Sequence, residues 1–191
     1  MFQNLSKYNI VLGSNSPRRR QLLHDLGLTF RVEAIKGIDE SVDPAMPVDL
    51  IAQSLAARKA MAHPLTADEL LITADTIVVL GEEVLGKPAD AEQARRMLHA
   101  LSGVKHRVIT GVALTTASRQ HAFSDITEVE FASLTDQEIN YYIERYAPFD
   151  KAGAYGIQEW IGYVGVRAIK GCFYNVMGLP LPRLWEELKR F

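Results

Sequence analysis

The stretch NIVLGSNSPRRRQLLHDLG, residues 9–27, indicates a strand, a polar loop and a helix in direct succession. A short apolar run ends at Gly13, and leucines then recur at helical spacing as far as Gly27, a natural helix stop. We expect Ser16 to be the N-cap and Pro17 the first helical residue. Proline has no backbone N–H, and the N–H of the first helical residue has no partner within the helix, so nothing is lost there. The stretch therefore predicts a strand that leads into the N-terminus of a helix.

The beginning of this predicted helix carries a concentration of positive charge. Arg18, Arg19 and Arg20 follow the proline, and cations are unfavourable at this end of the helix dipole unless an anion compensates them. Unpaired backbone N–H groups, the hydroxyls of Ser14 and Ser16 and the arginines together favour an anion, phosphate above all. The stretch is neither a Walker A loop nor a dinucleotide fingerprint. An ordinary strand-to-helix turn with a solvated arginine face stays open as the alternative.

Length and composition restrict the class of protein. The chain has 191 residues, of which 48% are hydrophobic and 23% charged, as in ordinary globular proteins. This length fits one domain, or one elongated domain with two lobes. The net charge of −2 provides no overall field that attracts nucleic acid or an anionic membrane. An anionic substrate must therefore be bound by a local cluster.

Cysteine content and hydropathy indicate the compartment. The single cysteine, Cys172, excludes an internal disulfide and a cysteine-based zinc site. The N-terminal residues lack the pattern of a signal peptide, and no apolar run approaches membrane-spanning length. We therefore expect a cytoplasmic protein with no membrane partner and no stable nucleic-acid partner.

Helical and strand-like segments alternate along the rest of the chain. Apolar spacing predicts further helices at Pro47–Ala62, Asp90–Leu101, Leu134–Tyr146 and Leu181–Phe191. We expect Asp90 to be an N-cap and Thr135 and Glu138 to form a capping box. Runs of apolar or β-branched residues predict strands at Thr29–Ala34, Leu70–Leu80, Glu83–Leu85, Arg107–Thr116, His121–Ala132 and Tyr163–Ile169. Arg107–Thr116 and His121–Ala132 are expected to form an antiparallel pair. The pattern predicts an α/β protein with a mixed sheet.

Some individual residues carry packing expectations. Ile51, Leu55 and Met61 are expected on the inner side of their helix. The aromatic residues Trp160, Tyr163 and Phe173 are expected in the core rather than in a base-stacking platform, and His106 is expected to be structural.

Asp75 is the most conspicuous residue after the arginines. It interrupts the apolar run of residues 70–80, and a carboxylate there cannot be buried without a cation, a metal ion or hydrogen-bond donors. The functional interpretation of Asp75 is a general base or a carboxylate linked to a metal ion. The structural alternative is a carboxylate that caps a strand end. We expect the predicted strand to be interrupted at this residue.

Other polar residues fit the same chemistry, although each on its own is better explained as a solvated side chain. They are Lys59, Lys87 and Glu40. The loop Asp150–Gln158 adds small residues that allow close backbone approach, and the Gln158 amide has a donor and an acceptor that suit a base edge. A phosphate-binding helix start, lysines and carboxylates together suit phosphoric anhydride chemistry with a divalent ion.

Several short motifs follow one another along almost the whole chain. They are SNSPRRRQLL at 14–23, Asp39-Glu40, Ala-Asp-Thr at 74–76, Gly86-Lys87-Pro88, Leu101-Ser102-Gly103 with His106, Thr110-Gly111, DKAGAYGIQ at 150–158 and NVMGLPL at 175–181. This ordered set resembles the Maf family of nucleoside triphosphate pyrophosphatases. The resemblance implies hydrolysis of a nucleoside triphosphate to the monophosphate and pyrophosphate, with a divalent cation, Mg²⁺ or Mn²⁺, as cofactor.

The resemblance also implies a fold and an assembly. The fold is a mixed twisted sheet flanked by helices with a central cleft, similar to that of inosine triphosphatase-like house-cleaning enzymes. We expect one domain over residues 1–191, with two lobes around the cleft. A homodimer is suggested by the resemblance alone.

Individual roles follow from the same resemblance. Asp75 corresponds to the proton acceptor, and Arg18, Thr76 and Gln158 correspond to substrate-specificity positions. The positions expected to handle phosphates and metal are Ser14, Arg19, Glu40, Lys59 and Lys87, and the predicted N-cap Ser16 lies among them in the phosphate loop. Glu40, with Asp75, is the expected metal ligand.

The specificity set resembles the branch that acts on dTTP and UTP, including modified pyrimidine nucleotides. The family usually continues Ile-Gln-Gly, whereas Gln158 is followed here by Glu159, which either alters base choice or points to solvent. Two alternatives stay open, a 7-methyl-GTP pyrophosphatase of the same family and a non-catalytic nucleotide-binding regulator of cell division. A nucleic-acid-binding module is disfavoured, because residues 18–20 are the only dense basic run.

Overall fold

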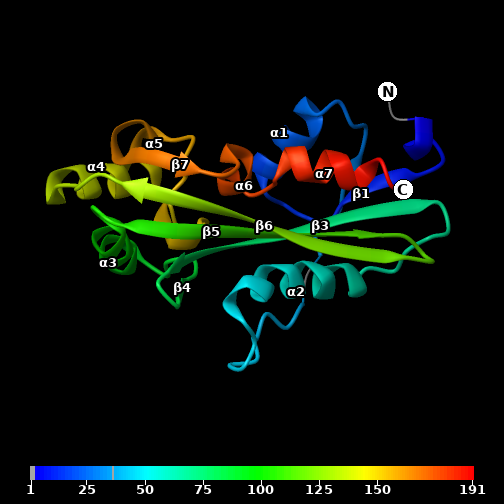
Figure 1. Cartoon of the computed structure of the whole chain (residues 1–191), viewed down its shortest axis with the longest axis horizontal. Coiled ribbons are helices and arrows are strands. Elements are labelled where there is room, and N and C mark those ends of the chain that lie inside the picture. The colour runs from blue at the N-terminus through cyan, green and yellow to red at the C-terminus, as the bar shows by residue number, and fades with distance from the viewer. Residues whose placement is uncertain (1–2, 36) are drawn as a thin grey trace. The chain divides into compact units, whose positions relative to one another are not determined.

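The computed structural model describes residues 3–35 and 37–191 as a mixed sheet with helices packed on it (Figure 1). The strands in these residues are β1 Asn9–Leu12, β2 Arg31–Val32, β3 Glu69–Leu80, β4 Glu83–Leu85, β5 Lys105–Thr115, β6 Gln120–Phe131 and β7 Val166–Lys170. The sheet order is β2-β1-β3-β5-β6-β7, and β4 pairs with β3. The α/β class with a mixed sheet flanked by helices is confirmed.

Helices connect most of these strands. They are α1 Pro17–Asp25, α2 Val48–Met61, α3 Ala91–Leu101, α4 Asp136–Tyr146, α5 Trp160–Gly165, α6 Phe173–Met177 and α7 Leu181–Leu188, with 3₁₀ turns η1 Gln3–Leu5 and η2 Ala152–Ala154. Among the described residues, no helix has both the length and the apolar character needed to cross a bilayer.

The chain divides into two compact units. The first unit comprises Met1–Asp75, Thr110–Asp125 and Gly178–Phe191, and the second comprises Thr76–Ile109 and Ile126–Met177. The boundaries fall inside β3, β5 and β6, so each of these three long strands contributes to both units.

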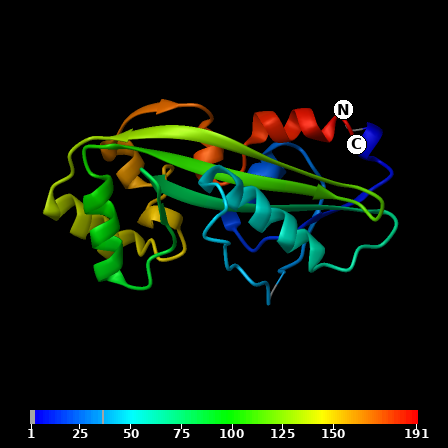
Figure 2. The same ribbon diagram turned by 60° about the horizontal axis from the view of Figure 1, so that its bottom comes forward.

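In the first unit, β1 lies between β2 and β3 and is parallel to both. Figures 1 and 2 show α2 on one side of the strands and α1 and α7 on the other. Thr73 of β3 donates from Oγ1 to the Ala56 carbonyl of α2 at 2.7 Å. At Gly111 of β5 a Cβ atom would lie only 2.2 Å from the carbonyl carbon and oxygen of Ala52. The α2 backbone therefore packs directly against the sheet.

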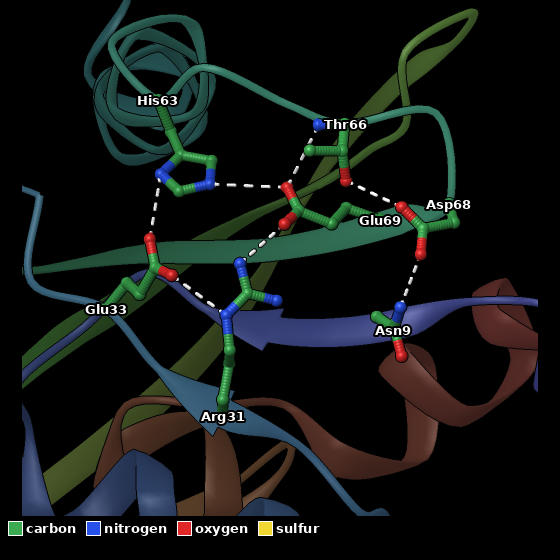
Figure 3. Close-up of polar contacts among 7 residues, drawn as sticks. All are labelled: Asn9, Arg31, Glu33, His63, Thr66, Asp68 and Glu69. Atoms are coloured by element: carbon green, nitrogen blue, oxygen red, sulfur yellow. Dashed lines mark hydrogen bonds and ion pairs between the residues drawn. The ribbon is translucent and has the colours of Figure 1, made fainter.

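An ionic network attaches the short strand β2 to its neighbours (Figure 3). Arg31 donates from Nε to Glu33 at 2.8 Å and from Nη2 to Glu69 at 2.5 Å. His63, just after α2, places Nδ1 3.4 Å from Glu33 and Nε2 3.6 Å from Glu69. Glu69 is the first residue of β3, at the opposite end of β1 from Gly13. The network therefore links the start of β3 to Glu33, which follows β2 and whose N–H donates to the Leu12 carbonyl at 3.0 Å.

The second unit encloses its own hydrophobic core. Strand β4 is antiparallel to the second half of β3, and β7 is antiparallel to β6. The core residues with the largest fully buried side chains are Leu98, Leu101, Phe131, Ile139 and Tyr142. These residues come mainly from α3, α4 and β6, so the loop that follows α4 is built on a packed core.

The helix starts agree with the sequence predictions. Ser16 caps α1 with Pro17 in its first turn, and Asp90 caps α3 by accepting from the Gln93 N–H. Thr135 and Glu138 form the predicted capping box of α4. The four-residue connection between β5 and β6, which are neighbours in the sheet, makes them antiparallel, as predicted.

Several expectations are wrong. Strand β3 continues through Asp75 without interruption, because its backbone ladder does not depend on the polarity of the side chain. Residues 163–165 belong to helix α5, so the expected strand begins only at Val166. Met61 is 76% exposed because it is the last residue of α2, and Tyr163 and Phe173 are also exposed rather than buried in the core.

Substitution Gly111→Ala tests the close packing of α2 on the sheet. We expect the free energy of unfolding to fall by about 3 kcal/mol, because the methyl group meets rigid backbone atoms of α2. Gly86→Ala is the control, since a Cβ there has no atom within 4 Å, and we expect a change below about 0.5 kcal/mol. Denaturant unfolding of both variants measures the difference. Equal stabilities would contradict the proposed packing.

Candidate active site

The loop between β1 and α1 is organised by two serine hydroxyls. Ser16 Oγ accepts the Arg19 N–H at 3.4 Å, and the Ser16 N–H donates to Ser14 Oγ at 3.2 Å. Gly13, at the end of β1, lies so close to neighbouring side chains that a Cβ would be 2.6 Å from Ile35 Cδ1. The predicted strand, loop and capped helix are confirmed, and both serines lie at the helix N-terminus.

Arg19 is fixed by acceptors from three parts of the first unit. Its Nη1 donates to the Ala74 carbonyl at 2.9 Å and to Ser14 Oγ at 3.3 Å, and its Nε donates to the Gly178 carbonyl at 2.8 Å. Burial lowers the pKa of Arg19 to about 10, against the opposing effect of the Asp75 carboxylate. The guanidinium is therefore still a cation at neutral pH.

Arg18 and Arg20 differ in their surroundings. Arg18 is half-buried, and its positive charge contributes to the lowered pKa of Arg19, whereas Arg20 is exposed. Arg18 therefore adds to the positive potential of the helix start. The three arginines of the sequence are not equivalent.

Lys59 joins the two carboxylates that the sequence singled out. Its Nζ forms an ion pair with Asp75 Oδ1 and lies 3.0 Å from Glu40 Oε1. The Lys59 and Asp75 side chains are each 16% exposed, whereas Glu40 is 63% exposed. The structure thus brings a helix residue, a strand residue and a loop residue together, and Asp75 has the cationic partner that its apolar flanks required.

The donor set around Lys59 suits a hard divalent cation. Glu40 and Asp75 each direct a carboxylate oxygen at the Lys59 ammonium, and Mg²⁺ is typically bound by one or two carboxylates together with substrate phosphates and water. Within residues 3–35 and 37–191, no group of three or more His, Cys, Asp or Glu side chains is arranged to hold a metal alone. A metal at this place would therefore need ligands from the substrate.

The second unit holds Thr76, Lys87 and Gln158. Thr76 is a half-buried residue of β3, and Lys87 is exposed after β4. The Gly153 N–H donates to the Gly86 carbonyl at 3.0 Å, which places the loop of Lys87 beside the loop that leads to Gln158. The structure therefore brings these two loops together, although they are more than sixty residues apart in the sequence.

Glu159 does not point to solvent. Its Oε2 accepts a hydrogen bond from the Tyr142 hydroxyl, and its Oε1 lies 3.1 Å from Lys151 Nζ. The side chain is 20% exposed. Sequence reasoning assigned no role to Tyr142, Lys151 or the Gly178 carbonyl, because only folding brings them to their partners. Lys151 and Gly178 do lie inside the motifs at 150–158 and 175–181.

His106 is buried beside the same loop. Its Nε2 lies 2.8 Å from the Tyr155 hydroxyl, and its ring packs edge-on against Phe131. Burial lowers the pKa of His106 to about 4 and raises the pKa of Tyr155. Both groups are therefore neutral at pH 7, which agrees with the structural role expected for His106.

The fold resembles that of proteins whose structures have been solved. Two solved structures, the Ham1 protein of Staphylococcus aureus and a HAM1 protein from Coxiella burnetii, are similar with TM-scores of 0.54 and 0.53. They are 14% and 18% identical to this chain in sequence. The matches cover 95% and 96% of this chain and 99% and 100% of the two solved chains. At this identity the similarity establishes a shared α/β fold.

The sequence comparisons establish the family. The model for Maf-like proteins matches residues 9–191, so the chain belongs to the Maf family. It is 54% identical to a protein of Phocaeicola vulgatus and 55% identical to one of Parabacteroides distasonis, each over the full length of both chains. A protein of Cytophaga hutchinsonii is 48% identical over 100% of this chain and 88% of its own. All three are named dTTP/UTP pyrophosphatase.

Acid titration tests the burial of His106. Since the unfolded chain binds the histidine proton near pH 6.5 and the folded chain only near pH 4, the free energy of unfolding should fall as pH drops through this range. We expect His106 to account for about 3 kcal/mol of this loss. His106→Gln should lack this component, because glutamine does not titrate there.

Denaturant unfolding at several pH values between 7 and 4 measures the effect. His24→Gln replaces an exposed histidine of α1 and should follow the wild type. An identical pH dependence in His106→Gln and wild type would contradict the assignment.

Proposed function

We propose that this protein hydrolyses dTTP, UTP and modified pyrimidine nucleotides to the monophosphate and pyrophosphate, with a house-cleaning role against non-standard nucleotides. The observation that carries the proposal is the arrangement at the end of β1, where a capped helix N-terminus, the fixed Arg19 cation and the Lys59–Asp75 pair lie around Ala74 and Asp75. Relatives that are 54% and 55% identical over the whole chain are named dTTP/UTP pyrophosphatase, which supports the proposal.

The helix start suits a polyphosphate. The positive end of the α1 dipole, the hydroxyls of Ser14 and Ser16 and the charges of Arg18 and Arg19 attract an anion at one place. Because Arg19 is already held by its carbonyl and hydroxyl acceptors, it loses little side-chain freedom when phosphate binds. We assign phosphate binding to these residues, with Lys59 and Lys87 supplying further charge.

Asp75 is the residue that we assign as proton acceptor. It would take a proton from the water whose oxygen attacks the α-phosphorus, while the bond to the bridging oxygen breaks and pyrophosphate leaves with the electron pair. Lys59, in contact with the Asp75 carboxylate, keeps that side chain oriented. Arg19 compensates charge that develops on the phosphate oxygens.

Glu40 and Asp75 would hold the divalent cation, Mg²⁺ or Mn²⁺. The cation, when bound, polarises the phosphate and neutralises its charge. Thr76, Gln158 and Arg18 are assigned to substrate selection. We also propose that residues 1–191 act as one catalytic domain, located in the cytoplasm and able to form a homodimer.

A substrate panel tests the proposed reaction. Pyrophosphate release is measured with dTTP, UTP, CTP, ATP, GTP and 7-methyl-GTP, each with Mg²⁺, with Mn²⁺ and with a chelator. We expect turnover of dTTP and UTP that the chelator abolishes. Preference for 7-methyl-GTP would support the other branch of the family, and absence of turnover on every nucleotide would support a binding or regulatory role.

Substitution Asp75→Asn tests the proton acceptor. We expect turnover of dTTP to fall about 100- to 10,000-fold, because the amide cannot accept the proton, while the variant still folds. Asp43→Asn is the control, since this exposed aspartate accepts the Ala45 N–H and asparagine can do the same. Steady-state kinetics and circular dichroism measure the two effects. Near-normal turnover in Asp75→Asn would contradict the role.

A further inference from the structure

The Gln158 side chain carries an acceptor without a partner. Among the described residues, Gln158 Oε1 is buried and accepts no hydrogen bond. Its amide packs on Gly156, where a Cβ would lie 3.0 Å from Nε2. A buried amide oxygen without a donor is costly unless a ligand supplies one. The orientation of this amide must therefore be set by the turn that carries it.

That turn is held by the hydroxyl of Tyr142. The hydroxyl accepts the Gly156 N–H at 3.0 Å and donates to Glu159 Oε2. The Glu159 N–H in turn donates to the Gly156 carbonyl at 3.0 Å, and the Glu159 carboxyl fills the space in which a Gly156 side chain would stand. Gln158 therefore lies in the chain between Gly156 and Glu159, and the Tyr142 hydroxyl is hydrogen-bonded to both of these residues.

Charge compensation gives this arrangement its rigidity. Lys151 is only 8% exposed on its side chain and lies 3.1 Å from Glu159 Oε1, with Asp150 as a second partner at 2.7 Å. A buried ammonium holds its carboxylate partners firmly, because separating the charges leaves one of them without compensation. Lys151 and Glu159 therefore tie together the two ends of the loop that contains Gln158.

A glutamine amide distinguishes bases only if it does not flip. Uracil and thymine present an N–H donor beside a carbonyl acceptor, whereas cytosine presents a ring-nitrogen acceptor beside an amino donor. An amide fixed with Oε1 toward the ring N–H and Nε2 toward the carbonyl selects uracil and thymine, and the flipped amide matches cytosine. A turn that keeps the Gln158 amide from flipping therefore fixes the choice between these two base edges.

We propose that Glu159 is a positioning residue that, held by Tyr142 and Lys151, fixes the amide orientation of Gln158 and thereby sets the preference for uracil and thymine over cytosine. This inference rests on the proposed function, since it takes Gln158 as the residue that contacts the base. It gives the glutamate that departs from the family pattern a defined role.

Three variants separate the contributions of the network. Glu159→Ala removes the carboxylate, and Glu159→Gln keeps an acceptor for the Tyr142 hydroxyl. Tyr142→Phe removes the shared hydroxyl while leaving the Lys151–Glu159 pair in place, so it serves if Glu159→Ala fails to fold. The control Glu144→Gln changes an exposed glutamate of α4, the helix that carries Tyr142.

Kinetics with UTP, dTTP and CTP measure the effect. In Glu159→Ala and Tyr142→Phe, we expect the ratio of kcat/KM for UTP over CTP to fall about ten- to hundredfold, through a higher KM for UTP with little change in kcat. Glu159→Gln should keep more of the ratio, and Glu144→Gln all of it. An unchanged ratio in both Glu159→Ala and Tyr142→Phe would overturn the proposal.

A spectroscopic measurement separates this inference from the proposed function. The side-chain amide NMR signals of Gln158, assigned by their loss in Gln158→Ala, should shift or broaden in Glu159→Ala and Tyr142→Phe and stay in place in Glu144→Gln. If the wild type turns over neither UTP nor dTTP, the proposed function fails, and these signals decide whether Glu159 positions Gln158. Unchanged signals in both network variants would overturn that positioning.

Discussion

A half-buried guanidinium needs acceptors for its N–H groups, and Arg19 finds them in segments of the first unit that are distant in sequence. The loop after β1, the middle of β3 and the loop that precedes α7 each supply one oxygen, from Ser14, Ala74 and Gly178 respectively. Because a charged donor forms stronger hydrogen bonds than a neutral one, this side chain fixes the helix start beside the strand that carries Asp75. The proposed phosphate site depends on that fixation.

Lys59 is a second cation that connects separate elements, here through the carboxylates of Asp75 and Glu40. Its ammonium lies between a strand aspartate and a loop glutamate, so three elements of the first unit meet at one cation. In the second unit, the Tyr142 hydroxyl connects segments as Lys59 does in the first, because it is hydrogen-bonded to both Gly156 and Glu159. In both units a polar group on a packed element orders a loop, which is how residues on loops become precise enough for catalysis.

Prediction from the sequence succeeded where local rules decide the conformation. The caps of α1, α3 and α4 depend on side chains that bond to backbone groups a few residues away, and all three were predicted. It failed where tertiary contacts decide. Residues 163–165 suit a strand or a helix by sequence, and in the structure they form the end of α5. Strand β3 continues through Asp75, whose carboxylate finds its cationic partner in Lys59 on another element.

From the sequence alone we could predict the capped helix with its arginines, the alternation of strands and helices, and the ordered motifs of the family, because these follow from neighbouring residues and their order. The partners of the charged side chains could not be predicted, because tertiary contacts select them: Lys59 meets Asp75 and Glu40 from 16 and 19 residues away. The tertiary structure also gave Glu159 its contacts with Tyr142 and Lys151, because ion pairs between distant residues form only when packing brings the charges together out of water.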